Sequence, residues 1–169
     1  MHIDAAVTVA IIVVGVGATA VLDLWASILK RVFGIPPPNY CLVGRWLRYM
    51  PAGVFRHESI AASPGKRFEC GVGWTAHYLI GVAFSMAFLW VMSGEWLREP
   101  RLLPALIFGI ATVAVPFLVM HPAFGLGIAA SKAPNPRQAR IRSVMAHAVF
   151  GVGLYVCALL LSALAGTYA

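Results

Sequence analysis

Residues 5–29 read AAVTVAIIVVGVGATAVLDLWASIL, with Asp23 as the one charged side chain, and this stretch decides the fold class. A transmembrane helix needs about 20 consecutive, mostly apolar residues. Three further stretches meet the same requirement, so the sequence predicts an all-α, polytopic membrane protein with four transmembrane helices in a single domain of residues 1–169. The four predicted spans are Ala5–Leu29, Gly71–Met92, Leu102–His121 and Val144–Ala165.

The composition excludes an ordinary soluble protein. Of the 169 residues, 60% are hydrophobic and 11% are charged, and the mean hydropathy is +0.83, whereas a soluble domain has about 25% charged residues. The net charge of +7 comes from lysines and arginines in two blocks beside apolar stretches. That arrangement is typical of membrane-protein loops rather than of a nucleic-acid-binding surface. The expected partner is therefore the lipid bilayer, and no nucleic acid is expected.

The charges of the three connections predict the orientation of the chain. The connections over residues 30–67 and 131–142 are strongly basic, whereas acids balance the arginines between residues 93 and 101. Lysine and arginine are retained in the cytoplasm, so the two basic loops are expected there and both termini outside. On this topology Cys41 and Cys70 lie on the reducing side, and we expect no disulfide.

Two local features add to the four spans. Pro116 and Pro122 interrupt the third span, and since proline removes a helical hydrogen bond, a kink or break is expected near residues 120–122. In the first connection, apolar residues recur at helical spacing with two arginines opposite, which predicts a short helix lying on the inner membrane surface. The apolar positions of this helix are Leu42, Val43, Trp46, Leu47 and Met50.

An internal repeat is predicted over residues 50–92 and 120–162, because the two segments share residues in the same order at an offset of about 70 positions. Since both segments run from inside to outside, the halves are expected to form two parallel helix-pair repeats around a pseudo-twofold axis along the membrane normal. The matches are Met50-Pro51-Ala52 with Met120-His121-Pro122-Ala123, Ile60-Ala61-Ala62-Ser63 with Ile128-Ala129-Ala130-Ser131, and Ala76-His77 before Gly81-Val82 with Ala146-His147 before Gly151-Val152.

Several loop motifs resemble those of an uncharacterised bacterial family of small membrane proteins, a domain of unknown function. The resemblance covers nearly the whole chain and implies a multi-pass protein of the bacterial inner membrane, with no known activity or catalytic residue. The motifs that carry it are Asp23-Leu24-Trp25, Asn39-Tyr40, Val43-Gly44-Arg45-Trp46-Leu47, Phe55-Arg56-His57, Ser59-Ile60-Ala61-Ala62, Gly127-Ile128-Ala129-Ala130-Ser131 and Pro134-Asn135-Pro136.

Four ionisable residues inside the predicted spans are the candidate functional residues: Asp23, His77, His121 and His147. Such side chains are costly in a bilayer and often mark ion or substrate paths. All four are expected in the cytoplasmic half of the bundle, where the repeat would bring His77 and His147 together. Two facing imidazoles suit a bis-histidine haem b, or a transition metal held with Asp23. Intramembrane histidines also hydrogen-bond across helices for packing alone.

Three functions remain open. A small proton- or cation-coupled transporter or channel, in which two copies of the chain could pair as a homodimer, would use the four residues as its path. A haem- or metal-binding redox protein would use His77 and His147, with Asp23 as a further metal candidate. An accessory membrane subunit would use the histidines for packing. No arrangement for nucleophilic catalysis is present in the sequence, and the transporter is ranked narrowly first, by analogy with duplicated transporters.

Overall fold

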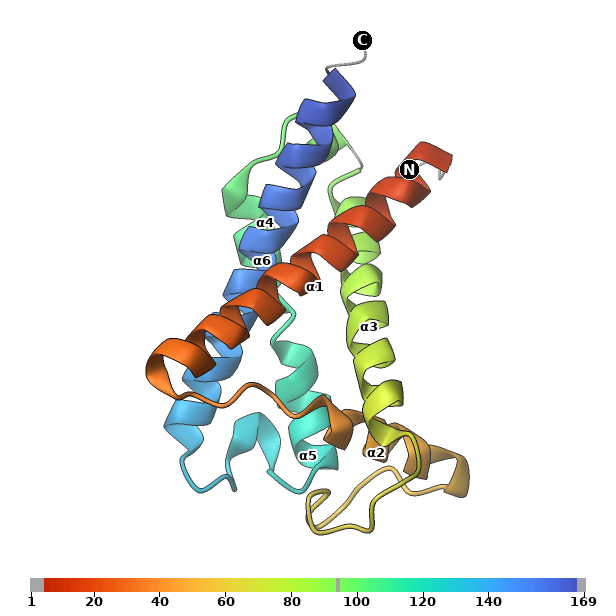
Figure 1. Ribbon diagram of the computed structural model, residues 1–169, viewed down its shortest axis with the longest axis vertical. Coiled ribbons are helices and arrows are strands. Elements are labelled where there is room, and N and C mark those ends of the chain that lie inside the picture. Colours follow the sequence, from red (N-terminus) through yellow and green to blue (C-terminus); the bar gives the residue numbers. More distant parts are fainter. Residues whose placement is uncertain (1–4, 94, 167–169) are drawn as a thin grey trace.

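The computed structural model describes residues 5–93 and 95–166, and every regular element in that part is a helix (Figure 1). This confirms the predicted all-α fold. Four segments are long and apolar enough to cross a membrane, as predicted: Ala5–Phe33 (α1), Glu69–Val91 (α3), Leu102–Ala123 (α4 to α5) and Pro136–Leu164 (within α6). The individual elements are α1 (Ala5–Phe33), α2 (Tyr40–Tyr49), η1 (Met50–Ala52), α3 (Glu69–Val91), η2 (Glu95–Leu97), α4 (Leu102–Ala111), η3 (Pro116–Met120), α5 (His121–Ala123), η4 (Ile128–Ala130) and α6 (Pro136–Gly166).

The fourth span begins earlier than predicted, at Pro136 instead of Val144. Proline is favoured at the first helical position, and the Asn135 side chain accepts a hydrogen bond from the Gln138 amide at 3.2 Å. The arginines assigned to the third connection therefore lie on the first turns of α6. The connection itself ends at Asn135.

The third span is broken, but not where the sequence predicted. The break was expected near residues 120–122 and lies instead at Thr112 and Val113, followed by the π-helical turn η3. Pro116 has no N–H to donate to the Thr112 carbonyl, which accepts instead from the Val115 amide at 3.1 Å. Pro122 lies in α5, which continues directly from η3 without a break.

The spans pack through glycines that let two backbones approach closely. A Cβ on Gly15 of α1 would lie 2.6 Å from the Val82 Cα of α3, and one on Gly153 of α6 would lie 2.8 Å from the Ala18 Cα of α1. A Cβ on Gly109 of α4 would likewise lie 2.6 Å from the Gly151 Cα of α6. Helix α1 thus packs against both α3 and α6, and α4 packs against α6.

The apolar core lies toward one end of the molecule. The beginning of α1 and the end of α6 lie at that end, which we call the terminal end, and α2 and α5 lie at the opposite, connection end (Figure 1). Helices α3 and α6 diverge toward the connection end, with α1 crossing them obliquely. The buried core residues are Ile11, Val14, Ala18, Phe88, Leu89, Trp96, Ala105, Phe150, Leu154 and Ala158.

Helix α2 confirms the short helix predicted in the first connection, and it packs against the beginning of α3. Two glycines make this approach possible: a Cβ on Gly44 would meet the Glu69 carbonyl oxygen, and one on Gly73 would meet the Tyr40 carbonyl oxygen. Arg45 pairs with the Glu69 carboxylate through two hydrogen bonds, of 2.7 and 2.9 Å. We call α2 with residues 50–68 and 121–135 the connection layer. Its position on an inner membrane surface stays a prediction.

A disulfide joins Cys41 of α2 to Cys70 of α3, so the expectation of no disulfide was wrong. Two cysteines separated by 29 residues carry no pairing signal by themselves. They meet because Gly44 and Gly73 let α2 approach the first turns of α3. Disulfides persist on the oxidising side of a membrane, whereas the basic residues of the same connection favour the cytoplasm. The orientation of the chain therefore stays a prediction.

The disulfide makes a direct prediction about thiol labelling. The chain purified without reductant and then denatured should react with one maleimide, at the free Cys157, and with three after reduction, as counted by intact mass. A Cys157→Ala variant is the control and should take up no label before reduction. Three labels on the unreduced chain would contradict the Cys41–Cys70 bond.

The two long connections contact each other within the connection layer. The His57 amide donates to the Ala123 carbonyl at 2.9 Å, and the Ile60 amide donates to the Phe124 carbonyl at 3.2 Å. His57 is half-buried, with its Nδ1 atom 3.0 Å from Ser63 Oγ. It is therefore part of the packed layer and not a solvated loop residue.

The two Ile-Ala-Ala-Ser segments of the predicted repeat share one hydrogen bond and differ in backbone conformation. The Ser63 amide donates to the Ile60 carbonyl at 3.3 Å, and the Ser131 amide donates to the Ile128 carbonyl at 3.0 Å. Ala129 and Ala130 have positive φ angles of 48° and 57°, whereas Ala61 and Ala62 do not adopt that conformation, so the two Ile-Ala-Ala-Ser segments form turns of different kinds. The superposition of the two halves about a twofold axis stays a prediction.

Candidate functional site

Asp23 and His77 meet on facing sides of α1 and α3, in the part of these helices that lies toward the connection end. His77 Nε2 lies 3.0 Å from Asp23 Oδ1, and the Tyr78 hydroxyl donates to Asp23 Oδ2 at 2.9 Å. Both oxygens of the carboxylate thus have a partner on α3. The side chains of His77 and Asp23 are 12% and 20% exposed. We call Asp23, His77 and Tyr78 the carboxylate cluster.

Aromatic rings surround the His77 imidazole. The Tyr40 ring stacks on it with centroids 3.9 Å apart, and the Trp74 ring meets it edge-on at 5.8 Å. Burial, and after it the negative charge of Asp23, raise the pKa of the Tyr40 phenol above its ordinary value. Tyr40 therefore stays protonated, and it brings an apolar face and no charge to the imidazole.

Tyr40 links the carboxylate cluster to the connection layer. It is the first residue of α2, where the Asn39 side chain accepts a hydrogen bond from the Cys41 amide at 3.1 Å. The next residue, Cys41, carries the disulfide to α3. The residues directly before and after Tyr40 are thus both fixed, and they hold its stacked ring in place.

His147 has a separate environment, at the break in the third span. Its Nδ1 atom lies 2.7 Å from Thr112 Oγ1, and that hydroxyl donates to the Gly109 carbonyl at 2.6 Å. A hydroxyl has one proton to donate, so His147 Nδ1 donates to Thr112. This pair satisfies polar groups where α4 ends.

His121 also lies apart from the carboxylate cluster. It begins α5, and its ring lies 5.6 Å from that of Phe117. Its Nδ1 atom is buried, and it has no hydrogen-bond partner among the residues that the structure describes. Desolvation of a neutral imidazole costs far less than that of a charged one.

The four predicted residues thus do not form one site. Asp23 and His77 come together as expected, whereas His147 bonds to α4 and His121 packs against Phe117. Helix α1 packs against both α3 and α6, and the polar partners of His77 and His147 lie on different helices. Over residues 5–93 and 95–166, no group of three or more His, Cys, Asp or Glu is placed to hold a metal ion. Asp23, His77 and His147 therefore do not form such a group.

Sequence reasoning missed four residues of these two environments: Tyr40, Trp74, Tyr78 and Thr112. Tyr78 could have been found, because it follows His77 and a neighbouring position on a helix can reach the same partner. Tyr40 gave no such signal, since its place depends on how α2 docks. Thr112 gave none either, because a single threonine is common in an apolar span.

The helices and the carboxylate cluster define a class of protein: a chain with four helices long and apolar enough to cross a membrane and an acid–histidine pair between two of them. Within that class, the chain belongs to a family described as a protein of unknown function, DUF2938, whose model matches residues 12–161. This confirms the resemblance to an uncharacterised family. No curated protein matches the chain significantly. No solved structure matches it significantly either.

Proposed function

We propose that the chain is a multi-pass membrane protein that moves protons, alone or coupled to another cation, and that the carboxylate cluster is its proton-binding site. The observation that carries this proposal is the 3.0 Å contact between Asp23 and His77 on two helices that are apolar enough to span a membrane. Ionisable residues in such helices are expensive and are typical of proton relays.

The charge of the pair explains why it would couple to a cation. With the imidazole protonated, the aspartate–histidine pair is neutral, and with the imidazole neutral it carries one negative charge. A net charge in a medium of low dielectric is costly. Loss of the proton therefore favours arrival of another proton or cation, which is the basic requirement of coupled transport.

The geometry also supports access from water. The side chains of His77 and Asp23 are 12% and 20% exposed, so neither is fully enclosed by the protein. Tyr78 keeps the second carboxylate oxygen hydrogen-bonded, so the carboxylate remains positioned while the proton on the His77 imidazole is exchanged.

A packing role is the competing function. The stacking of Tyr40 on His77 and the hydrogen bond of His147 to Thr112 support it, because both satisfy or bury polar rings between helices. Under this alternative, loss of Asp23 lowers stability and has no effect on flux.

Proton flux into liposomes tests the proposal. Purified protein would be reconstituted with an internal pH dye, and a potassium diffusion potential would drive the movement. We expect uptake above that of empty liposomes for the unchanged chain and uptake at the empty level for Asp23→Asn, which retains the shape of the side chain. Glu99→Gln removes a carboxylate that is 83% exposed and is the matched control, with unchanged uptake.

Two results would count against the proposal. If the unchanged chain gives no more flux than empty liposomes, the molecule does not move protons under these conditions and the packing role stands. If Asp23→Asn retains full flux, the carboxylate cluster is not the site. Elution of each variant as a folded species during size exclusion separates loss of flux from loss of folding.

A further inference from the structure

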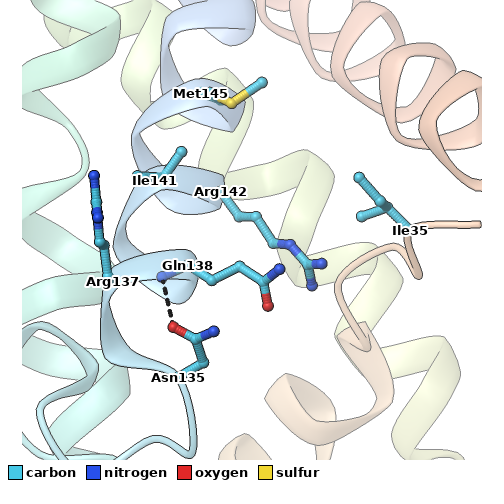
Figure 2. Close-up of a pocket in the computed structure, with 7 residues that line it drawn as sticks. All are labelled: Ile35, Asn135, Arg137, Gln138, Ile141, Arg142 and Met145. Carbon is cyan, nitrogen blue, oxygen red and sulfur yellow. Dashed lines mark hydrogen bonds between the residues drawn. The ribbon is translucent and has the colours of Figure 1, made fainter. Parts of the chain in front are cut away.

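A pocket of about 320 Å³ lies between the linker that follows α1 and the first turns of α6. Figure 2 shows the Arg142 and Gln138 side chains extending from α6 toward Ile35 on the linker. The pocket combines polar and apolar walls in one place. Its lining residues are Ile35, Asn135, Arg137, Gln138, Ile141, Arg142 and Met145.

Within the described part of the chain, no acidic side chain forms an ion pair with the arginines of this pocket. The ion pairs of the described residues join Arg45 to Glu69, His77 to Asp23 and Arg101 to Glu99, and none includes an arginine of α6. No aspartate or glutamate occurs after Glu99 in the sequence. The arginines at the start of α6 are therefore uncompensated cations.

The site does not depend on free amides at the start of α6. The Asn135 side chain already accepts from the Gln138 amide, as the dashed line in Figure 2 marks. The attraction for an anion comes from the Arg142 guanidinium, a group that binds phosphate through two parallel hydrogen bonds. The Gln138 side-chain amide can add a further donor, and Arg137 adds positive charge from the other side of the same helix (Figure 2).

The other half of the pocket is apolar and remains exposed. Ile141 and Met145 are 48% and 43% exposed, and they follow each other along one face of α6. At the end of α1, just before the linker, Val32 and Phe33 are 65% and 66% exposed. A free phosphate ion would leave these side chains uncovered, whereas an acyl chain would cover them.

We propose that this pocket binds an anionic glycerophospholipid, with its phosphate on Arg142 and Gln138 and an acyl chain against Ile141 and Met145. A basic pocket at the end of a transmembrane helix is a common way to hold an anionic headgroup. The volume of about 320 Å³ suits a phosphate with its glycerol unit. This site is separate from the carboxylate cluster and does not depend on the proposed proton movement.

The test compares defined lipids on the purified full chain. Dioleoyl phosphatidylglycerol, dioleoyl phosphatidylcholine and inorganic phosphate would each be titrated into the protein in detergent, with bound lipid counted by native mass spectrometry. We expect one phosphatidylglycerol to bind at least about tenfold more tightly than phosphatidylcholine, as for a charge-assisted contact. Arg142→Gln should lower the affinity for phosphatidylglycerol about tenfold. The affinity of Arg142→Lys should lie between that of Arg142→Gln and that of the unchanged chain.

Arg48→Gln is the matched control, because it removes an exposed arginine on α2 and should leave the affinity unchanged. Equal binding of both lipids would overturn the proposal in favour of non-specific bilayer contact. Displacement of phosphatidylglycerol by millimolar phosphate would identify an ion site instead. Unchanged affinity in both Arg142 variants would place the lipid elsewhere.

Discussion

Gly73→Ala should destabilise the folded chain by about 1–3 kcal/mol, the usual cost of forcing a methyl group into a packed contact. The new Cβ would meet the Tyr40 carbonyl oxygen and would lie 2.7 Å from the Tyr40 carbonyl carbon and 3.0 Å from the Gly44 amide nitrogen. These are backbone atoms, so no side chain can rotate away. Helix α2 has to shift from α3, which disturbs the disulfide and the Arg45–Glu69 pair together.

Gly71→Ala provides the matched control for this substitution. Gly71 lies two positions away on α3, and a Cβ added there would have no heavy atom of another part of the described chain within 4 Å. Alanine in place of a helical glycine gains up to about 1 kcal/mol from helix propensity alone. In denaturant unfolding in detergent, Gly71→Ala should therefore be at least as stable as the unchanged chain, and Gly73→Ala should be less stable. Equal stabilities for the two variants would show that α2 does not dock as described.

Arg45→Met should cost about 1–3 kcal/mol, because it removes the charge-assisted hydrogen bonds of a half-buried ion pair and leaves the Glu69 carboxylate without its partner. The side chains of Arg45 and Glu69 are each 15% exposed. The guanidinium also donates to the carbonyls of Ile60, Ala61 and Ser63, at 3.2, 3.2 and 2.9 Å. One arginine thus holds α2, α3 and the first connection together.

Two comparisons test the role of Arg45 in the same unfolding measurement. Arg48→Met removes an exposed arginine of the same helix and should change stability by less than about 0.5 kcal/mol. Arg45→Met combined with Glu69→Met should recover part of the loss, since no half-buried charge is left without its partner. A double variant as unstable as the sum of its single variants would show that the two residues do not act as a pair.

The four spans could be predicted because apolar length is a property of each segment alone. Residues 5–29 and 71–92 needed no partner to be recognised as helices. The break in the third span was misplaced because proline acts on the carbonyl four residues before it, so Pro116 disturbs Thr112 and not its own position. The beginning of α6 was missed because a charged helical turn and a charged loop look alike in composition.

Two of the three residues of the carboxylate cluster could be predicted from the sequence. Asp23 and His77 stood out as ionisable residues in apolar stretches, and their similar depth suggested that they meet. The expected contact of His77 with His147 depended on the spatial order of the helices, which the residues of single spans do not contain. The disulfide was missed for a related reason. The charge of the loop placed Cys41 and Cys70 in a reducing compartment, whereas their pairing follows from how closely α2 approaches α3.

The uneven distribution of the core means that different forces hold the two ends of the molecule. Opening the terminal end exposes Phe88 and Leu154 to solvent or lipid. Opening the connection layer breaks polar contacts, exposes a few smaller buried side chains such as Ile60 and Val43, and leaves that core intact. Local opening should therefore require less free energy at the connection layer than global unfolding does. Tyr40 stacks on His77 and lies next to the disulfide-bonded Cys41, so hydration of the carboxylate cluster depends on how firmly one short helix stays docked while the spans stay folded.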